Sequence, residues 1–221
     1  MTATSTSSAP PADIPREAKL TLAVASLAVL AVFLDTTVLF VAFPDIVATF
    51  DTVAPAQLSW VLNAYTIVFA ALLVPAGKFA DRLGHKRAFL AGSVLFTVAS
   101  MACGLAPSAG ILIAFRVVQA VGAATLIPSS LALLLRAFPP AKVPFAVAIW
   151  GASGAVAGAL GPTLGAVLVE AASWRWVFFI NLPIGLFTVI AGRRFLHESK
   201  DETASVPAPL GVSLFALAAG L

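Results

Sequence analysis

The sequence predicts an all-α membrane protein, and two observations support that prediction. Hydrophobic residues make up 60% of the 221 residues and charged residues 10%. Soluble domains carry about 25% charged residues, so this chain is too apolar for a soluble fold. The mean hydropathy is +1.01. The apolar residues also form runs of about 20 residues, the length that an α-helix needs to cross a bilayer.

These apolar runs follow one another along the whole chain. We expect membrane-spanning helices at residues 20–43, 58–76, 88–106, 109–136, 145–169 and 176–193. Together they form a transmembrane bundle over residues 19–198. The single cysteine, Cys103, lies within one of these runs, and the simplest interpretation is that it is a small packing residue.

Polar segments flank the bundle. Residues 1–18 are rich in Ser, Thr, Ala and Pro and lack the apolar core of a signal peptide, so we expect a disordered cytoplasmic tail. Residues 199–208 are expected to form a cytoplasmic linker. Residues 209–221 begin another apolar run, and about 13 residues are too few to span a bilayer. We therefore expect an incomplete seventh helix, in a fragment or a natural truncation of a larger two-bundle protein.

The basic residues predict the orientation of the bundle. All of the 13 Lys and Arg residues except Arg116 and Arg175 lie in the N-terminal tail or after the second, fourth and sixth spans. Cytoplasmic loops are enriched in Lys and Arg, so the N-terminus is expected in the cytoplasm. This topology accounts for the net charge of +3. No nucleic-acid partner is expected.

Residues 77–87 (GKFADRLGHKR) form the densest cluster of charge between two spans. A loop that only fixes orientation needs basic residues, but it needs neither an acid among them nor glycines at fixed spacing. The constrained positions are Gly77, Asp81, Arg82, Gly84, Lys86 and Arg87. The pattern resembles the signature loop between helices 2 and 3 of the major facilitator superfamily of transporters. The resemblance implies a cytoplasmic gate at these residues.

Further motifs resemble the proton-coupled drug antiporters with fourteen spans, a group within that superfamily. They are Leu34-Asp35-Thr36-Thr37 with Pro44 in the first span, Arg116 with Gln119 in the fourth, Gly161-Pro162 with Gly165 in the fifth, and Trp174-Arg175-Trp176 with Asn181 at the sixth. The implied fold is a six-helix N-terminal bundle made of two inverted three-helix repeats. A missing C-terminal bundle would complete it.

Asp35, Arg116 and Gln119 are the candidate residues for coupling protons to substrate. A charge at bilayer depth is costly and usually functional. At 1.5 Å per residue, Asp35 and Arg116 lie roughly 12 and 10 Å below the outer surface, so the two charges share one layer. Gln119 lies one turn further in. Asn181 is closer to a helix end, where polarity costs less.

Each of these residues also has a structural interpretation. Asp35 can be a buried structural acid, Arg116 its ion-pair partner, and Gln119 an amide that bridges helices. The glycines at 151, 154, 158, 161 and 165 can form a packing face, with or without a functional bend at Pro162. Trp174 and Trp176 fit an aromatic belt at the outer interface.

The resemblance implies export of amphipathic, often cationic compounds across the cytoplasmic membrane, driven by proton entry. Asp35 would exchange a proton or bind the substrate, with Arg116 controlling its charge. A non-transporting half that acts as a scaffold or assembly partner is one alternative, and a proton symporter is another. No enzyme is expected, because the chain has no nucleophile–base set and no metal-ligand cluster. No cofactor is expected either.

Overall fold

The computed structural model describes residues 14–198, and every regular element within them is helical. The long helices are α1 (Arg16–Thr49), α3 (Trp60–Leu83), α4 (His85–Gly104), α5 (Ala109–Ala137), α6 (Val143–Ala171) and α8 (Asn181–Phe195). Short helices α2 (Pro55–Leu58) and α7 (Trp176–Phe179) precede α3 and α8, and a 3₁₀ turn, Pro140–Lys142, precedes α6. The expected linker at 199–208, the start of a helix at 209–221 and most of the N-terminal tail lie outside the described residues.

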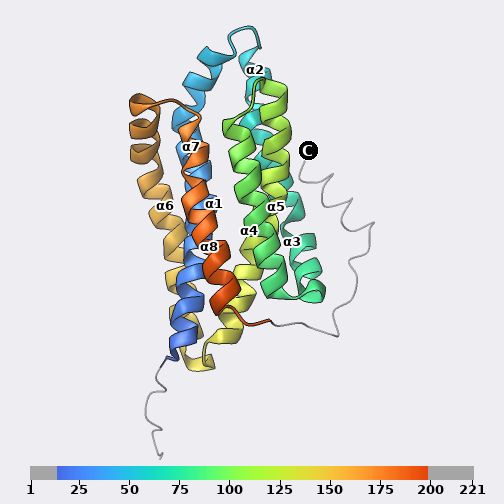
Figure 1. Ribbon diagram of the computed structural model, residues 1–221, viewed down its shortest axis with the longest axis vertical. Helices are drawn as coiled ribbons and strands as arrows, with labels where there is room; N and C mark the ends of the chain where they lie inside the picture. Colours follow the sequence, from blue (N-terminus) through green and yellow to red (C-terminus); the bar gives the residue numbers. More distant parts are fainter. Residues whose placement is uncertain (1–13, 199–221) are drawn as a thin grey trace, which may run out of the picture.

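Six spans of the described chain are long and apolar enough to cross a membrane, which confirms the all-α membrane fold. In Figure 1, α1 and α6 lie beside α7 and α8, while α3, α4 and α5 form a second group. The most extensive contacts join α4 to α5, α1 to α6 and α3 to α5.

The helix contacts have the pattern of two repeated units, α1–α3–α4 and α5–α6–α8. If α1, α3 and α4 correspond to α5, α6 and α8, the α1–α6 contact corresponds to the α5–α3 contact. In the same way the α4–α5 contact corresponds to the α8–α1 contact, and all four contacts are present. Each unit has three spans, so α1 and α5 run in opposite directions. This arrangement is the inverted repeat expected of a half-transporter bundle.

Several helices are longer than the apolar runs suggested. Helix α1 starts at Arg16 and continues through Pro44 to Thr49, instead of covering 20–43. Its first residues belong to the segment expected to be a disordered tail. At 1.5 Å per residue, its 34 residues measure about 51 Å, well beyond the hydrocarbon core. Hydropathy detects only the part of a helix that lies in lipid, so the polar ends were missed.

The segment 77–87 is helical and not the loop that was expected. Gly77, Asp81 and Arg82 lie in the last turns of α3, and Lys86 and Arg87 in the first turn of α4. Only Gly84 separates the helices, with φ of 101°. That backbone conformation suits glycine, because it has no Cβ to clash.

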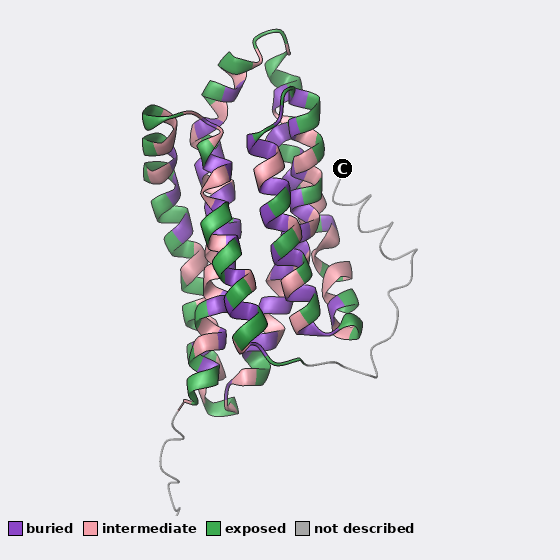
Figure 2. Ribbon diagram, viewed as in Figure 1, coloured by how far each residue is buried: buried purple, intermediate pink, exposed green. Residues whose placement is uncertain are grey.

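Helices α1 and α6 pack closely through glycine. A Cβ on Gly161 would collide with the Thr37 side chain, and one on Gly165 would lie 3.0 Å from the Val38 carbonyl oxygen. Gly151 and Gly158 have open space around them, so only part of the expected glycine face packs on α1. Figure 2 shows that the buried residues follow the surfaces where helices meet.

At the end of the bundle opposite the α3–α4 turn, residues of the Trp174-Arg175-Trp176 motif join the helices. Trp174 is 4% exposed and its Nε1 donates to Thr49 Oγ1 at 2.9 Å. An Arg175 guanidinium nitrogen donates to the Ala106 carbonyl oxygen at 3.3 Å. The aromatic-belt interpretation was therefore wrong for Trp174, which packs inside the protein. Trp176, at 51% exposed, remains compatible with it.

Candidate functional site

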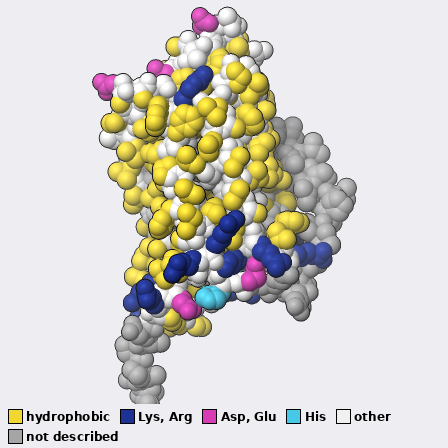
Figure 3. Space-filling view, in the orientation of Figure 1, with side chains coloured by type: hydrophobic (Ala, Val, Ile, Leu, Met, Phe, Trp, Pro, Cys, Tyr) yellow, Lys and Arg dark blue, Asp and Glu magenta, His cyan; other side chains and the backbone are white. Residues whose placement is uncertain are grey.

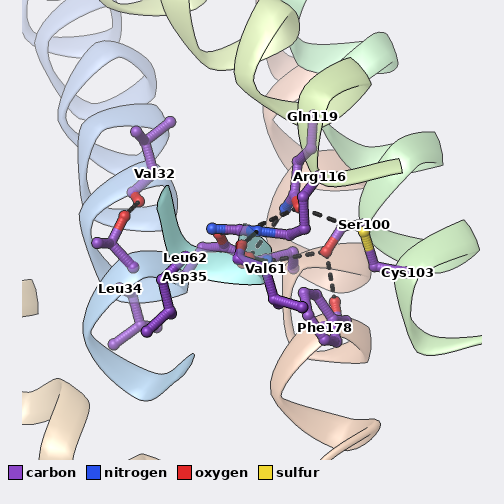
Figure 4. A network of polar contacts seen from close by, with 12 residues as sticks. Val32, Leu34, Asp35, Val61, Leu62, Ser100, Cys103, Arg116, Gln119 and Phe178 are labelled. Atoms are coloured by element: carbon purple, nitrogen blue, oxygen red, sulfur yellow. Dashed lines mark hydrogen bonds and ion pairs between the residues drawn. The ribbon is translucent and has the colours of Figure 1, made fainter. Parts of the chain in front are cut away.

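A buried polar network lies between the helices, with Asp35 of α1 at its centre. The Asp35 carboxylate is fully enclosed, and its Oδ2 accepts a hydrogen bond from Arg116 Nη1 at 2.6 Å. Figure 4 shows Asp35 approaching Arg116 and Gln119 of α5, with Ser100 and Cys103 of α4 close by. The contact expected from the shared depth of Asp35 and Arg116 is present.

Arg116 is held by more than its charge. Its Nε donates to the Val61 carbonyl oxygen of α3 at 3.1 Å, and its Nη1 also donates to Gln119 Oε1 at 2.8 Å. The guanidinium lies 3.9 Å from the ring centroid of Tyr65, also on α3. Stacking on an aromatic face stabilises a desolvated cation. The planar guanidinium therefore joins α1, α3 and α5 at one point.

Gln119 uses both ends of its amide. Its Nε2 donates to Asp35 Oδ1 at 2.8 Å, while its Oε1 accepts from Arg116 and from Cys103 Sγ, the latter at 3.6 Å. The thiol of Cys103 is thus a packing residue that also touches the network. An amide in this position satisfies a carboxylate and a guanidinium together.

Asn181 also belongs to this network, contrary to the expectation that it lies in a less costly place near a helix end. It begins α8 and is 0% exposed. Its Nδ2 donates to Asp35 Oδ1 at 2.8 Å and to Ser100 Oγ at 3.0 Å. Ser100 in turn donates to the Phe178 carbonyl oxygen at 2.9 Å. An amide side chain in an apolar span is a common functional residue, but the position of Asn181 in the sixth-span motif did not indicate how deeply it is buried.

The arrangement links α1, α5 and α8 directly through the Asp35 carboxylate. A carboxylate in a dry interior is stabilised in its charged form by an adjacent guanidinium and by donated hydrogen bonds. Within residues 14–198, no group of three His, Cys, Asp or Glu residues is arranged to hold a metal ion.

The gate-motif residues lie far from this network, at the opposite ends of α3 and α4. Asp81 Oδ1 lies 3.6 Å from His85 Nε2, and the Asp81 side chain is 42% exposed. The Lys86 backbone N–H donates to Glu198 Oε1 at 3.1 Å, and Arg87 lies 3.7 Å from the same carboxylate. Glu198 therefore caps the first turn of α4 from beyond the end of α8.

Pro162 lies within α6, which continues unbroken from Val143 to Ala171. Its neighbours Gly161 and Gly165 contact α1 directly after the turn that carries Asp35. The Gly161-Pro162 motif of the fifth span is thus connected to the network through its packing against α1.

Charge is divided between the two ends of the molecule. Figure 3 shows Lys and Arg side chains gathered near the lower end and mainly acidic side chains at the upper end. The lower end holds the α3–α4 and α5–α6 turns, and the upper end carries Asp45, Asp51 and Glu170. The folded bundle thus gathers most basic residues at one end, as the order of the spans along the sequence predicted.

Membrane-length helices in two inverted triplets, with an ion pair buried between them, define a polytopic transporter bundle. A family model described as Major Facilitator Superfamily matches residues 25–217. The chain therefore belongs to the Major Facilitator Superfamily, and its helices are those of the N-terminal half of that fold.

Two curated relatives are named as export proteins. The chain is 38% identical to the tetracenomycin C resistance and export protein of Streptomyces glaucescens over 90% of its length and 37% of that protein. It is 36% identical to the multidrug export protein EmrB of Escherichia coli over 88% of its length and 38% of that protein. The chain thus spans well under half of each relative.

Solved structures match the fold. A bacterial homologue of the human lysosomal transporter Spinster aligns with a TM-score of 0.66 and 20% identity, over 87% of this chain and 46% of that one. The superfamily and these relatives are membrane transporters and not enzymes. The protein is accordingly a multi-pass membrane protein.

Proposed function

We propose that the chain is the N-terminal half of a proton-coupled antiporter that exports amphipathic, cationic drug-like compounds across the cytoplasmic membrane. The observation that carries the proposal is the buried Asp35–Arg116 ion pair between α1 and α5, in which Arg116 Nη1 lies 2.6 Å from Asp35 Oδ2. The drug-export relatives support the direction of transport and the class of substrate. The charge distribution supports an N-terminus in the cytoplasm.

In this mechanism Asp35 exchanges the driving proton. Its side chain has no exposed surface, even though the described chain is only about half of the fold. This burial favours a proton role over direct contact with a substrate. Arg116 pairs with the carboxylate in the arrangement described, and rocking of the bundle that separates the two side chains would couple proton exchange to the change of conformation.

The cytoplasmic gate is assigned to the α3–α4 junction. Asp81 projects from the end of α3 with an exposed side chain, so it is placed to meet a second bundle. Gly84 provides the sharp turn, and Glu198 fixes the start of α4. A C-terminal bundle would then close against this end of the molecule.

The proposal is tested by Asp35→Asn in the full-length transporter that contains this chain. We expect it to abolish proton-driven dye transport in energised everted vesicles, because an amide does not titrate. Asp35→Glu should keep partial activity with a shifted pH optimum. The matched control is Asp45→Asn, on the same helix but exposed, which should transport normally.

Two outcomes would contradict the proposal in different ways. If Asp35→Asn transports like the unmodified protein throughout the neutral pH range, the acid is structural. If the unmodified full-length protein transports no substrate although it is correctly inserted, the scaffold alternative is favoured.

A further inference from the structure

One amide atom of the buried network lacks a partner among the described residues. Asn181 Oδ1 is fully buried and accepts no hydrogen bond from the described residues, although Nδ2 of the same amide donates twice. Buried acceptors are almost always paired, so an unpaired one beside the Asp35 carboxylate needs an explanation.

The two amides around Asp35 differ in their freedom. Gln119 has both amide ends engaged, so turning it would break its bonds to Asp35, Arg116 and Cys103. Turning Asn181 breaks the two bonds of its Nδ2 and brings its unpaired oxygen to the place where that nitrogen now meets the carboxylate and Ser100. Asn181 is thus the neighbour able to offer Asp35 an acceptor.

Protonation of Asp35 creates the need for such an acceptor. An ionised carboxylate only accepts hydrogen bonds, whereas a carboxylic acid carries one O–H donor. In the arrangement described, both amides direct N–H groups at Oδ1, and Arg116 directs another at Oδ2. A proton arriving from solvent on Oδ1 would have no acceptor facing it.

We propose that Asn181 is a positioning residue that reads the protonation state of Asp35 by turning its amide. Its Nδ2 donates to the ionised carboxylate, and its Oδ1 accepts the O–H of the protonated acid. This inference rests on the proposed role of Asp35 as the proton carrier. The other charged or titratable groups around the site are Arg116 of α5, Tyr65 of α3 and Cys103 of α4.

The turn would be passed on through Ser100. The Ser100 hydroxyl now accepts from Asn181 Nδ2 and donates to the Phe178 carbonyl oxygen. Once the amide oxygen faces Ser100, the hydroxyl can donate to it instead and release Phe178. The carbonyl belongs to α7, directly before the break that leads into α8. Protonation on α1 is thereby linked to the backbone of the sixth span.

Hydrogen bonds to other parts of the bundle hold both ends of this span, and Asn181 lies between them. At one end, Trp174 bonds to Thr49 and Arg175 bonds to Ala106. At the other end, Lys86 Nζ donates to the Arg193 carbonyl oxygen at 3.0 Å.

The test compares Asn181→Leu with Thr188→Val in the full-length transporter. Leucine has a similar size but neither donates nor accepts. Thr188 is a buried polar residue on the same helix whose side chain donates to the Ile184 carbonyl oxygen of its own turn, so its variant controls for general loss of polarity. Two readouts are measured against pH: vesicle transport, and the infrared C=O band of protonated Asp35, identified by its absence in Asp35→Asn.

We expect Asn181→Leu to shift the pH midpoint of the Asp35 band, because leucine offers neither the donor nor the acceptor of the amide. The band frequency should also change, and the transport profile should follow the midpoint. Thr188→Val should match the unmodified protein. An unchanged midpoint and frequency in Asn181→Leu would overturn the inference.

If Asn181→Leu does not insert stably, the isosteric pair Asn181→Thr and Asn181→Val decides the question. The threonine hydroxyl can both donate and accept, so it should stay closer to the unmodified midpoint than valine. Equal midpoints would reject the amide role. Failure of the proposed function is separate, because it would appear as normal proton-dependent transport in Asp35→Asn.

Discussion

At the scale of single residues, Arg116 shows why a guanidinium is needed. One side chain bonds to the Asp35 carboxylate, the Gln119 amide and the Val61 backbone, and its face lies on Tyr65. A lysine ammonium is a point charge and cannot reproduce this planar set of contacts. Arg116→Lys should therefore be poorly tolerated although it keeps the charge.

A mutant cycle tests the coupling of Asp35 with Arg116. Removing one partner of a buried ion pair strands the other charge and typically costs about 3–5 kcal/mol. Arg116→Ala should therefore lower thermal stability in detergent more than the double variant Asp35→Asn with Arg116→Gln. Strictly additive effects in the cycle would show that the two side chains do not interact.

The sequence identified the charged members of the network but not all of its neutral ones. Asp35 and Arg116 stand out because ionisable residues are rare in apolar spans. Ser100 and Tyr65 do not, because hydroxyl-bearing residues occur throughout such spans and bond readily within their own helix. Asn181 was discounted because the start of α8 was assumed to lie near the membrane surface, whereas α7 precedes it and carries it inward.

At the scale of elements, the α1–α6 contact depends on the absence of a side chain. The Cβ of an alanine at position 161 would collide with Thr37, whereas Gly158, on the same helix, has nothing within 4 Å. Gly161→Ala should therefore destabilise the bundle by about 1–3 kcal/mol through overpacking.

Gly158→Ala provides the matched control for this contact. Alanine favours a helix over glycine by about 1 kcal/mol, so this variant should be neutral or slightly stabilising. Both variants are compared by thermal unfolding in detergent. Equal melting temperatures would mean that α1 can move away from α6 without cost, and that the close approach is not required.

The existence and order of the spans were predictable, and their ends were not. Apolar runs report the hydrocarbon thickness, but the helices continue beyond it wherever the backbone still gains hydrogen bonds. For this reason the charged segment 77–87 extends two helices and leaves only Gly84 as a turn. The tertiary contacts of Glu198 and Trp174 come from distant segments, so local patterns carried no sign of them.

At the scale of the whole molecule, the separation of charge predicts which end faces the cytoplasm. In a Cys103→Ala background of the full-length protein, Asp51→Cys should react with an impermeant thiol reagent added to intact cells. Ala141→Cys, in the exposed turn between α5 and α6, should react only after permeabilisation. His85 is unsuitable for this test because it is 2% exposed and would be shielded on either side. Labelling of position 141 in intact cells would reverse the assigned orientation.

The pairing of Asp35 with Arg116 also has a consequence during synthesis. The two residues are 81 positions apart, so at about 5–20 residues per second Arg116 is made roughly 4–16 s after Asp35. The first helix must therefore enter the bilayer while its acid has no partner. An acid at the helix centre opposes insertion by about 2.5–3.5 kcal/mol.

Helix α1 has the composition to overcome that opposition. Its apolar segment is the most hydrophobic among the six membrane-length spans of the described chain. Each central Leu, Ile, Phe or Val contributes about −0.3 to −0.6 kcal/mol to insertion, so a handful of them offsets the acid. The high hydrophobicity of α1 thus keeps an unpaired acid in the bilayer during synthesis, until the helix that carries its partner has been made.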